Sequence, residues 1–145
     1  MTATLDVGSA TTRRWRRVKA PTLLAGAVLG TSMLLHFRDP HESGSWGFCP
    51  WLLLTGTSCP GCGTLRAVND LTRGDVASAA SSNLLFVGAV PLLIFWWGRW
   101  FTDRWNGVRR QVSTRRALTC AGVALVVAIG FAVLRNTPWG AWLAP

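Results

Sequence analysis

Three long apolar stretches divide the chain. They run from about Pro21 to Phe37, from about Leu84 to Trp97 (to Phe101 if Arg99 extends outward), and from about Ala117 to Leu134. A helix needs about 20 mostly apolar residues to cross the hydrocarbon core, with a lower limit near 17. The pattern predicts an all-α membrane protein with three transmembrane helices, in preference to buried helices of a soluble protein.

The composition agrees with this prediction. Half of the 145 residues are hydrophobic, and 14% are charged, where a soluble domain has about 25%. The chain has nine Trp and no Tyr, and Trp favours the membrane interface. Pro91 lies inside the second stretch, where we expect it to kink the helix, which membrane helices tolerate.

Basic residues are concentrated in two segments. Five of them precede the first stretch, and six arginines with one aspartate lie between the second and third stretches. The link between the first and second stretches instead has three arginines and four acidic residues. Basic residues mark the cytoplasmic side. We therefore expect the N-terminus inside, loop 38–83 outside, loop 99–116 inside and the C-terminus outside. The inner basic residues are Arg13, Arg14, Arg16, Arg17, Lys19, Arg99, Arg104, Arg109, Arg110, Arg115 and Arg116.

The predicted organisation is a basic cytoplasmic segment, residues 1–20, followed by one membrane domain, residues 21–145. The net charge of +9 is then explained by topology and anionic lipid, and we expect no nucleic-acid partner. The expected location is a bacterial cytoplasmic (inner) membrane, with the bilayer and other membrane proteins as partners. Arg13-Arg14 resembles the start of a twin-arginine signal, but Arg16 and Arg17 follow where apolar residues are expected. No small-x-small cleavage site lies near His36, so we expect an uncleaved anchor.

The outer loop contains patterns of short helices. Apolar residues recur every third position from Thr64 to Thr72, which predicts an amphipathic helix on the membrane surface, with Arg66 and Asp70 as an i,i+4 pair. Gly74 is expected to end this helix, and Asp75 to cap a further one, Val76 to Ser82. Trp51 to Leu54 is too short to span and is expected to dip into the interface. Asn83 is expected to hydrogen-bond another helix.

Three of the four cysteines, Cys49, Cys59 and Cys62, lie in this loop, whereas Cys120 lies in the third span and is expected to pack as a small apolar residue. One interpretation is a structural disulfide, which leaves one thiol unpaired. Another is a zinc site of the three thiols with His36 or His41 as a fourth ligand, because a Cys₃His set suits tetrahedral zinc. The loop has one C-x-x-C, at Cys59 to Cys62, and no second one, which weakens the zinc interpretation.

The third interpretation is redox chemistry at Cys59-Pro60-Gly61-Cys62. A C-x-x-C at a helix N-terminus has its thiolate pKa lowered by the free N–H groups and the helix dipole, and Arg66 would add to this. Cys59 and Cys62 would then be the candidate catalytic residues, Cys59 as the nucleophile and Cys62 as the resolving thiol. The absence of a thioredoxin-like βαβ pattern weakens this interpretation.

The loop resembles the domain of unknown function 2752 (DUF2752) family of small bacterial membrane proteins. That family is marked by Cys-Pro, then Cys-Pro-x-Cys-Gly-x-x-Arg-[Ala/Ser], then Gly-Asp, then an Asn before an apolar helix. The resemblance extends from about Phe48 to Trp97, and it departs from the family at Asn83-Leu84, where members often have Asn-Pro. The matching residues are Cys49, Pro50, Cys59, Pro60, Gly61, Cys62, Gly63, Arg66, Gly74, Asp75 and Asn83.

The resemblance implies a membrane protein with an important Cys/Arg motif, and it implies no activity, because the family is uncharacterised. The spans contain no Asp, Glu or Lys, which argues against a proton relay. The leading hypothesis is an accessory or structural membrane protein rather than an enzyme. The alternatives are a membrane thiol–disulfide oxidoreductase and a zinc-binding docking module.

Overall fold

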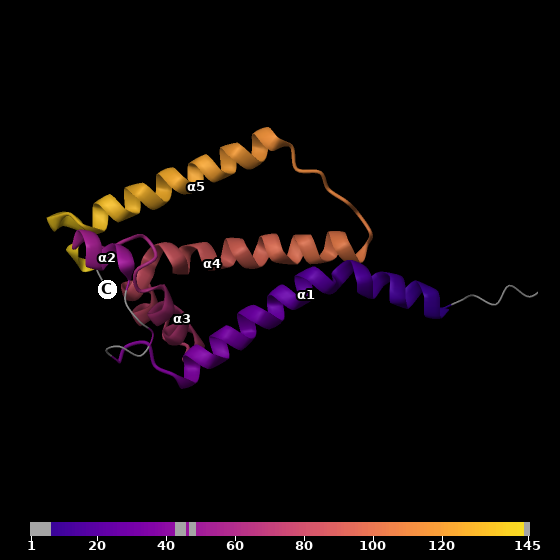
Figure 1. The fold of residues 1–145 in the computed structure, drawn as a ribbon, viewed down its shortest axis with the longest axis horizontal. Helices are drawn as coiled ribbons and strands as arrows, with labels where there is room; N and C mark the ends of the chain where they lie inside the picture. The colour runs from indigo at the N-terminus through magenta and orange to yellow at the C-terminus, as the bar shows by residue number, and fades with distance from the viewer. Residues whose placement is uncertain (1–6, 43–45, 47–48, 144–145) are drawn as a thin grey trace, which may run out of the picture.

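The structure, a computed structural model, describes residues 7–42, 46 and 49–143 (Figure 1). All regular elements within these residues are helical, as predicted. In chain order they are α1 (Val7–Phe37), α2 (Pro50–Thr55), α3 (Thr64–Thr72), α4 (Val76–Trp105), α5 (Thr114–Arg135) and the 3₁₀ helix η1 (Pro138–Leu143).

Three of these helices are long and apolar enough to cross a membrane: Arg14–Phe37 within α1, Val76–Trp105 and Thr114–Arg135. This confirms the three predicted spans and makes the chain a multi-pass membrane protein. Helix α1 begins at Val7, well before the expected start at Pro21. The residues before the proline include arginine, lysine and alanine, which are strong helix formers, so the helix continues through Pro21.

Helix α4 combines two predicted elements, the short helix Val76–Ser82 and the second span. The backbone of Asn83, with φ −160° and ψ 92°, is extended and separates the two helical parts. Asp75 caps the first part, because its side chain accepts a hydrogen bond from the N–H of Ser78 at 2.9 Å. The interruption falls at Asn83, whereas Pro91, where a kink was expected, keeps helical dihedral angles.

The helices converge at one end of the molecule. Helix α3 lies between the C-terminal part of α1 and the N-terminal part of α4, and α1 also packs against α4 (Figure 1). Further along, the indole Nε1 of Trp97 donates to the carbonyl of Pro21 at 3.1 Å. Helix α5 contacts η1 at its C-terminal end, and no residue in its most apolar segment is buried. Such a long apolar surface is suited to contact with lipid.

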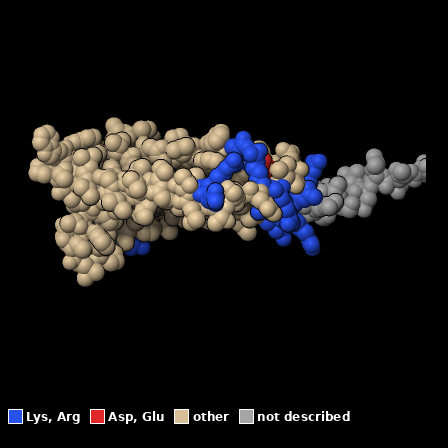
Figure 2. All heavy atoms as spheres, turned by 90° about the horizontal axis from the view of Figure 1, so that it is seen from above, with Lys and Arg blue, Asp and Glu red and all other residues tan. Residues whose placement is uncertain are grey.

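Most of the basic residues lie at one end of the bundle, and the cysteine cluster lies at the other. Figure 2 shows Lys and Arg gathered toward the end where α1 begins and α4 leads into α5. The other end holds α2, α3, η1 and the cysteine loop (Figure 1). Exposed Trp51, Leu53 and Leu54 of α2, with Trp139 and Trp142 of η1, form apolar surface at that end. These side chains suit the headgroup layer, where amphipathic indole rings are favoured.

Candidate functional site

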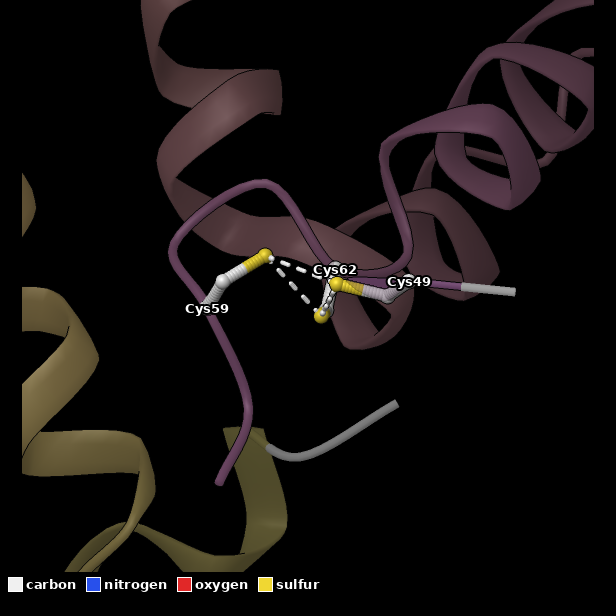
Figure 3. Close-up of side chains that lie close together, drawn as sticks. All are labelled: Cys49, Cys59 and Cys62. Carbon is white, nitrogen blue, oxygen red and sulfur yellow. Dashed lines mark hydrogen bonds between the residues drawn. The ribbon is translucent and has the colours of Figure 1, made fainter. Parts of the chain in front are cut away.

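The sulfurs of Cys49, Cys59 and Cys62 converge on one point in the loop between α1 and α3 (Figure 3). The Sγ–Sγ distances are 3.6 Å from Cys49 to Cys59, 3.0 Å from Cys59 to Cys62 and 3.5 Å from Cys62 to Cys49. All three are free thiols; Cys62 is buried, and the other two are half-buried. The sequence-predicted cluster is therefore one compact triangle of sulfurs.

Helix α2 positions the first thiol. Cys49 is its N-cap residue, and Pro50 follows in the first turn, where a missing backbone N–H costs nothing. Gly56 ends the helix in the left-handed conformation, with φ 66°, and returns the chain toward the second thiol. None of the residues of α2 is buried, so packing alone holds this helix weakly.

A tight turn positions the other two thiols. The N–H of Cys62 donates to the carbonyl of Cys59 at 3.1 Å, and the N–H of Thr64 donates to that of Gly61 at 3.1 Å. Gly63, with φ 80°, is the N-cap of α3. Only glycine adopts this backbone readily, which explains the glycine after the second cysteine of the motif.

Asn83 binds the back of this turn. Its Nδ2 donates to the carbonyls of Pro60 at 3.0 Å and Cys62 at 3.1 Å, and approaches Thr64 Oγ1 at 3.2 Å. Its Oδ1 accepts from the N–H of Phe86 at 3.0 Å, which caps the second part of α4. The sequence predicted a bond from Asn83 to another helix; its partners are Thr64, the first residue of α3, and the cysteine loop before it.

The end of α5 binds the same turn from the other side. Nη1 of Arg135 donates to the carbonyls of Cys59 and Cys62, both at 3.1 Å. Asn136 pairs with the backbone of Ser58, accepting its N–H at 2.8 Å and donating to its carbonyl at 2.8 Å. The carbonyls of Ser58, Cys59, Pro60 and Cys62 are thus all bound by side chains of α4 and the α5 terminus, and the turn is held rigidly.

The thiols differ in their electrostatic environment. Burial, and then hydrogen bonds to Cys59 and Cys49, raises the pKa of Cys62 to about 12. The backbone N–H of Leu52, and then the Cys62 side chain, lowers the pKa of Cys49 at the start of α2, although no capping hydrogen bond closes there. At Cys62, which directly precedes the N-cap of α3, desolvation outweighs any lowering of the pKa by the helix N-terminus. The lowering occurs at Cys49 instead.

This arrangement is chemically suited to a cation. Tetrahedral zinc with bonds of about 2.3 Å separates its sulfur ligands by about 3.8 Å, so the thiols need to move apart by less than about 1 Å. Three thiols this close cannot all ionise without a cation between them, whereas a bound metal ion deprotonates its thiol ligands. The cluster could therefore hold a metal, and zinc is compatible with it.

The two histidines lie elsewhere. Nδ1 of His36 is 2.9 Å from Thr72 Oγ1. His41 has Nδ1 2.8 Å from Asp39 Oδ1 and Nε2 3.5 Å from Asp70 Oδ1. Among the described residues the metal-ligand group consists of the three cysteines, with neither histidine in it. The sequence suggested a histidine as the fourth ligand. Because both histidines are engaged with the partners named above, the fold brings neither of them to the cluster.

Arg66 and Asp70 do not form the predicted pair. Asp70 is buried and accepts a hydrogen bond from Ser82 Oγ at 3.1 Å, beside the contact with His41. Arg66 has no ion pair among the residues that the structure describes. The α3 face that carries Asp70 packs against α4, so the carboxylate is drawn inward rather than along the exposed surface.

The arginine that reaches the cysteine turn is Arg135, and neither this residue nor Asn136 was among the site residues predicted from the sequence. The available signal was a single arginine at the end of the third span on the predicted outer side, against the general charge distribution. Of the remaining motif residues, Gly74 ends α3 with φ 79° and Asp75 caps α4. Cys120 is exposed on α5 rather than packed.

A family model described as "Protein of unknown function (DUF2752)" matches residues 49–97. The matched segment contains the three clustered cysteines and Asn83, and it ends before α5. The search of curated proteins and the search of solved structures each returned no match.

Proposed function

Because residues 49–97 match the model of the DUF2752 family, whose description assigns no activity, we propose a function from the geometry of the site. The chain is a metal-binding membrane protein whose Cys49, Cys59 and Cys62 thiolates hold one soft cation such as Zn²⁺. The observation that carries this proposal is the convergence of three sulfurs within 3.0–3.6 Å of one another.

The metal would act as a staple and as a docking point. Helix α2 has no buried residue, so a bond from Cys49 to the metal would fix it against the junction of α3, α4 and α5. Three protein ligands leave one position of a tetrahedral ion for water or for a group from a partner. Both features agree with an accessory membrane protein. Its outer loop would bind a partner when it is loaded with metal.

A metal assay on the full chain tests this proposal. The protein is purified in detergent without reductant or chelator, and metal content and thiol reactivity are measured. We expect about one zinc ion per chain, with the three clustered thiols protected until a chelator is added. Cys120 lies outside the cluster on α5, so its reaction with a membrane-permeant thiol reagent should not depend on the chelator, which gives an internal control. Metal-free protein that stays fully thiol-reactive after incubation with Zn²⁺ would refute the proposal.

A second candidate is thiol–disulfide exchange. The observation that favours it is the 3.0 Å approach of Cys59 and Cys62, the shortest of the three sulfur separations. In that reaction the two thiols give two electrons and two protons to a substrate disulfide, which leaves as a dithiol while Cys59 and Cys62 form a disulfide. The same assay separates the candidates, since this reaction requires a metal-free Cys59–Cys62 disulfide that dithiols readily reduce.

The orientation of the chain is a separate proposal. The basic end faces the cytoplasm of a bacterial cell, and the cysteine cluster faces outward. Fusions of alkaline phosphatase after Pro145 and after Asn106 test this. We expect activity from the first, which would be exported, and none from the second. A reporter that is active only inside the cell should give the reverse pattern. The proposal is refuted if both reporters indicate the opposite orientation.

A further inference from the structure

Arg135 is a buried cation at the cysteine cluster. Its side chain is 2% exposed at the end of α5, and its guanidinium lies 5.2 Å from the ring centroid of Phe131. Arginine is almost never this deeply buried unless an anion pairs with it. Its two hydrogen bonds go to neutral acceptors, the carbonyls of Cys59 and Cys62.

The hydrogen-bonding capacity of this side chain is not used up. Nε and Nη2 of Arg135 are buried and have no hydrogen-bond partner. Within the described part of the chain, no carboxylate lies within salt-bridge distance of the guanidinium. A buried charge with two unused donors is costly, and the cost is offset when an anionic group occupies the same site.

The cysteine cluster can supply that anion. Three thiolates around one divalent cation have a net charge of −1, and one guanidinium neutralises it. Resting on the proposed metal-binding function, we propose that Arg135 is a positioning residue that compensates the charge of the metal–thiolate centre and selects a divalent ion for it. A monovalent ion on the same three thiolates leaves an uncompensated negative charge in a buried site, which is unfavourable.

This role explains why the arginine is on α5. The two hydrogen bonds to carbonyls hold the guanidinium against the turn that carries Cys59 and Cys62. Its positive charge would therefore lie near the metal site without contacting the metal. Outer groups of this kind that orient ligands change metal affinity by about 10- to 100-fold. Helix α5 is exposed along its apolar segment. The attraction between Arg135 and the metal-loaded cluster would therefore also hold this helix to the rest of the protein.

Metal titration of the full chain and three variants in detergent tests the proposal. Arg135→Gln keeps donors but loses the charge, Arg135→Lys keeps the charge, and Arg115→Gln removes an exposed arginine at the other end of the same helix. Co²⁺ binding is followed by its thiolate charge-transfer absorption, and Zn²⁺ by competition with a chelator. We expect Arg135→Gln to bind about 10- to 100-fold more weakly, and Arg135→Lys and Arg115→Gln to remain within about tenfold of the unmodified chain.

The outcomes are distinct. Unchanged affinity in Arg135→Gln overturns the role of Arg135 while leaving the metal site in place. Equal weakening by Gln and Lys also overturns it, because the charge would then be irrelevant. If Arg135→Gln does not fold, the folded Arg135→Lys variant decides: affinity reduced beyond about tenfold refutes the proposal. An unmodified chain that binds neither ion overturns the metal function and this inference together.

Discussion

Replacing Cys62 with serine should lower the zinc affinity of the chain by more than about 100-fold, beyond what loss of an outer supporting group costs. Cys62 is the buried member of the triangle, 3.0 Å from Cys59 and 3.5 Å from Cys49. Its raised pKa, about 12, means that the metal-free thiol is protonated at neutral pH, and that binding must release this proton. Serine is far less acidic than a thiol and a poor ligand for a soft ion, so one of three bonds is lost.

The matched control is Cys120→Ser, because Cys120 is exposed on α5 outside the cluster. Titration with Zn²⁺ in competition with a chelator should give the unmodified affinity for this variant. Cys49→Ser and Cys59→Ser should resemble Cys62→Ser, since each leaves two thiolates. If Cys62→Ser and Cys120→Ser bind zinc equally well, the three sulfurs do not form the metal centre.

Much of the fold could be predicted from the sequence because its signals are local. Helix α3 occupies the predicted residues Thr64–Thr72, since its apolar period is bounded by Gly63 and Gly74, both in the left-handed conformation. The start of α1 at Val7 could not be predicted from the apolar pattern, because the apolar stretch begins only at Pro21 and the helix extends through this proline into the basic segment before it.

The candidate site was predictable only in part. A C-x-x-C brings two thiols together by its spacing, and Cys49 joined them as the remaining cysteine of the same loop. The groups that hold the turn come from far along the chain: Asn83 from 23 residues after Pro60, and Arg135 from 76 residues after Cys59. No spacing rule relates such residues. The i,i+4 rule likewise misplaced Asp70, because packing of α3 on α4 overrides a weak surface pair.

The hydrogen bonds also indicate what a metal site at this cluster would require before any metal binds. A rigid turn places two sulfurs within reach of one ion only if its carbonyls are satisfied, since buried unpaired carbonyls favour other backbone conformations. The polar side chains at the ends of two apolar helices supply those bonds. The spans therefore act as the scaffold of the cluster as well as its membrane anchor.

Replacing Asn83 with alanine should destabilise the fold by roughly 2–4 kcal/mol, through loss of a helix cap and of hydrogen bonds to buried carbonyls. Asn83 is 1% exposed, and it both interrupts α4 and holds the carbonyls of Pro60 and Cys62. Alanine can do neither. The measurement is unfolding by SDS titration in mixed micelles, followed by circular dichroism.

Two further variants separate the roles of Asn83. Asn83→Ser keeps a capping oxygen for the N–H of Phe86 but loses the amide that reaches the turn, so we expect a smaller loss of stability together with weaker metal binding. Asn106→Ala removes an exposed asparagine at the far end of the same helix and should stay within about 0.5 kcal/mol of the unmodified chain. If Asn83→Ala is as stable as Asn106→Ala, the cysteine turn is held by Arg135 and Asn136 alone. The α4 interruption would then contribute nothing to the site.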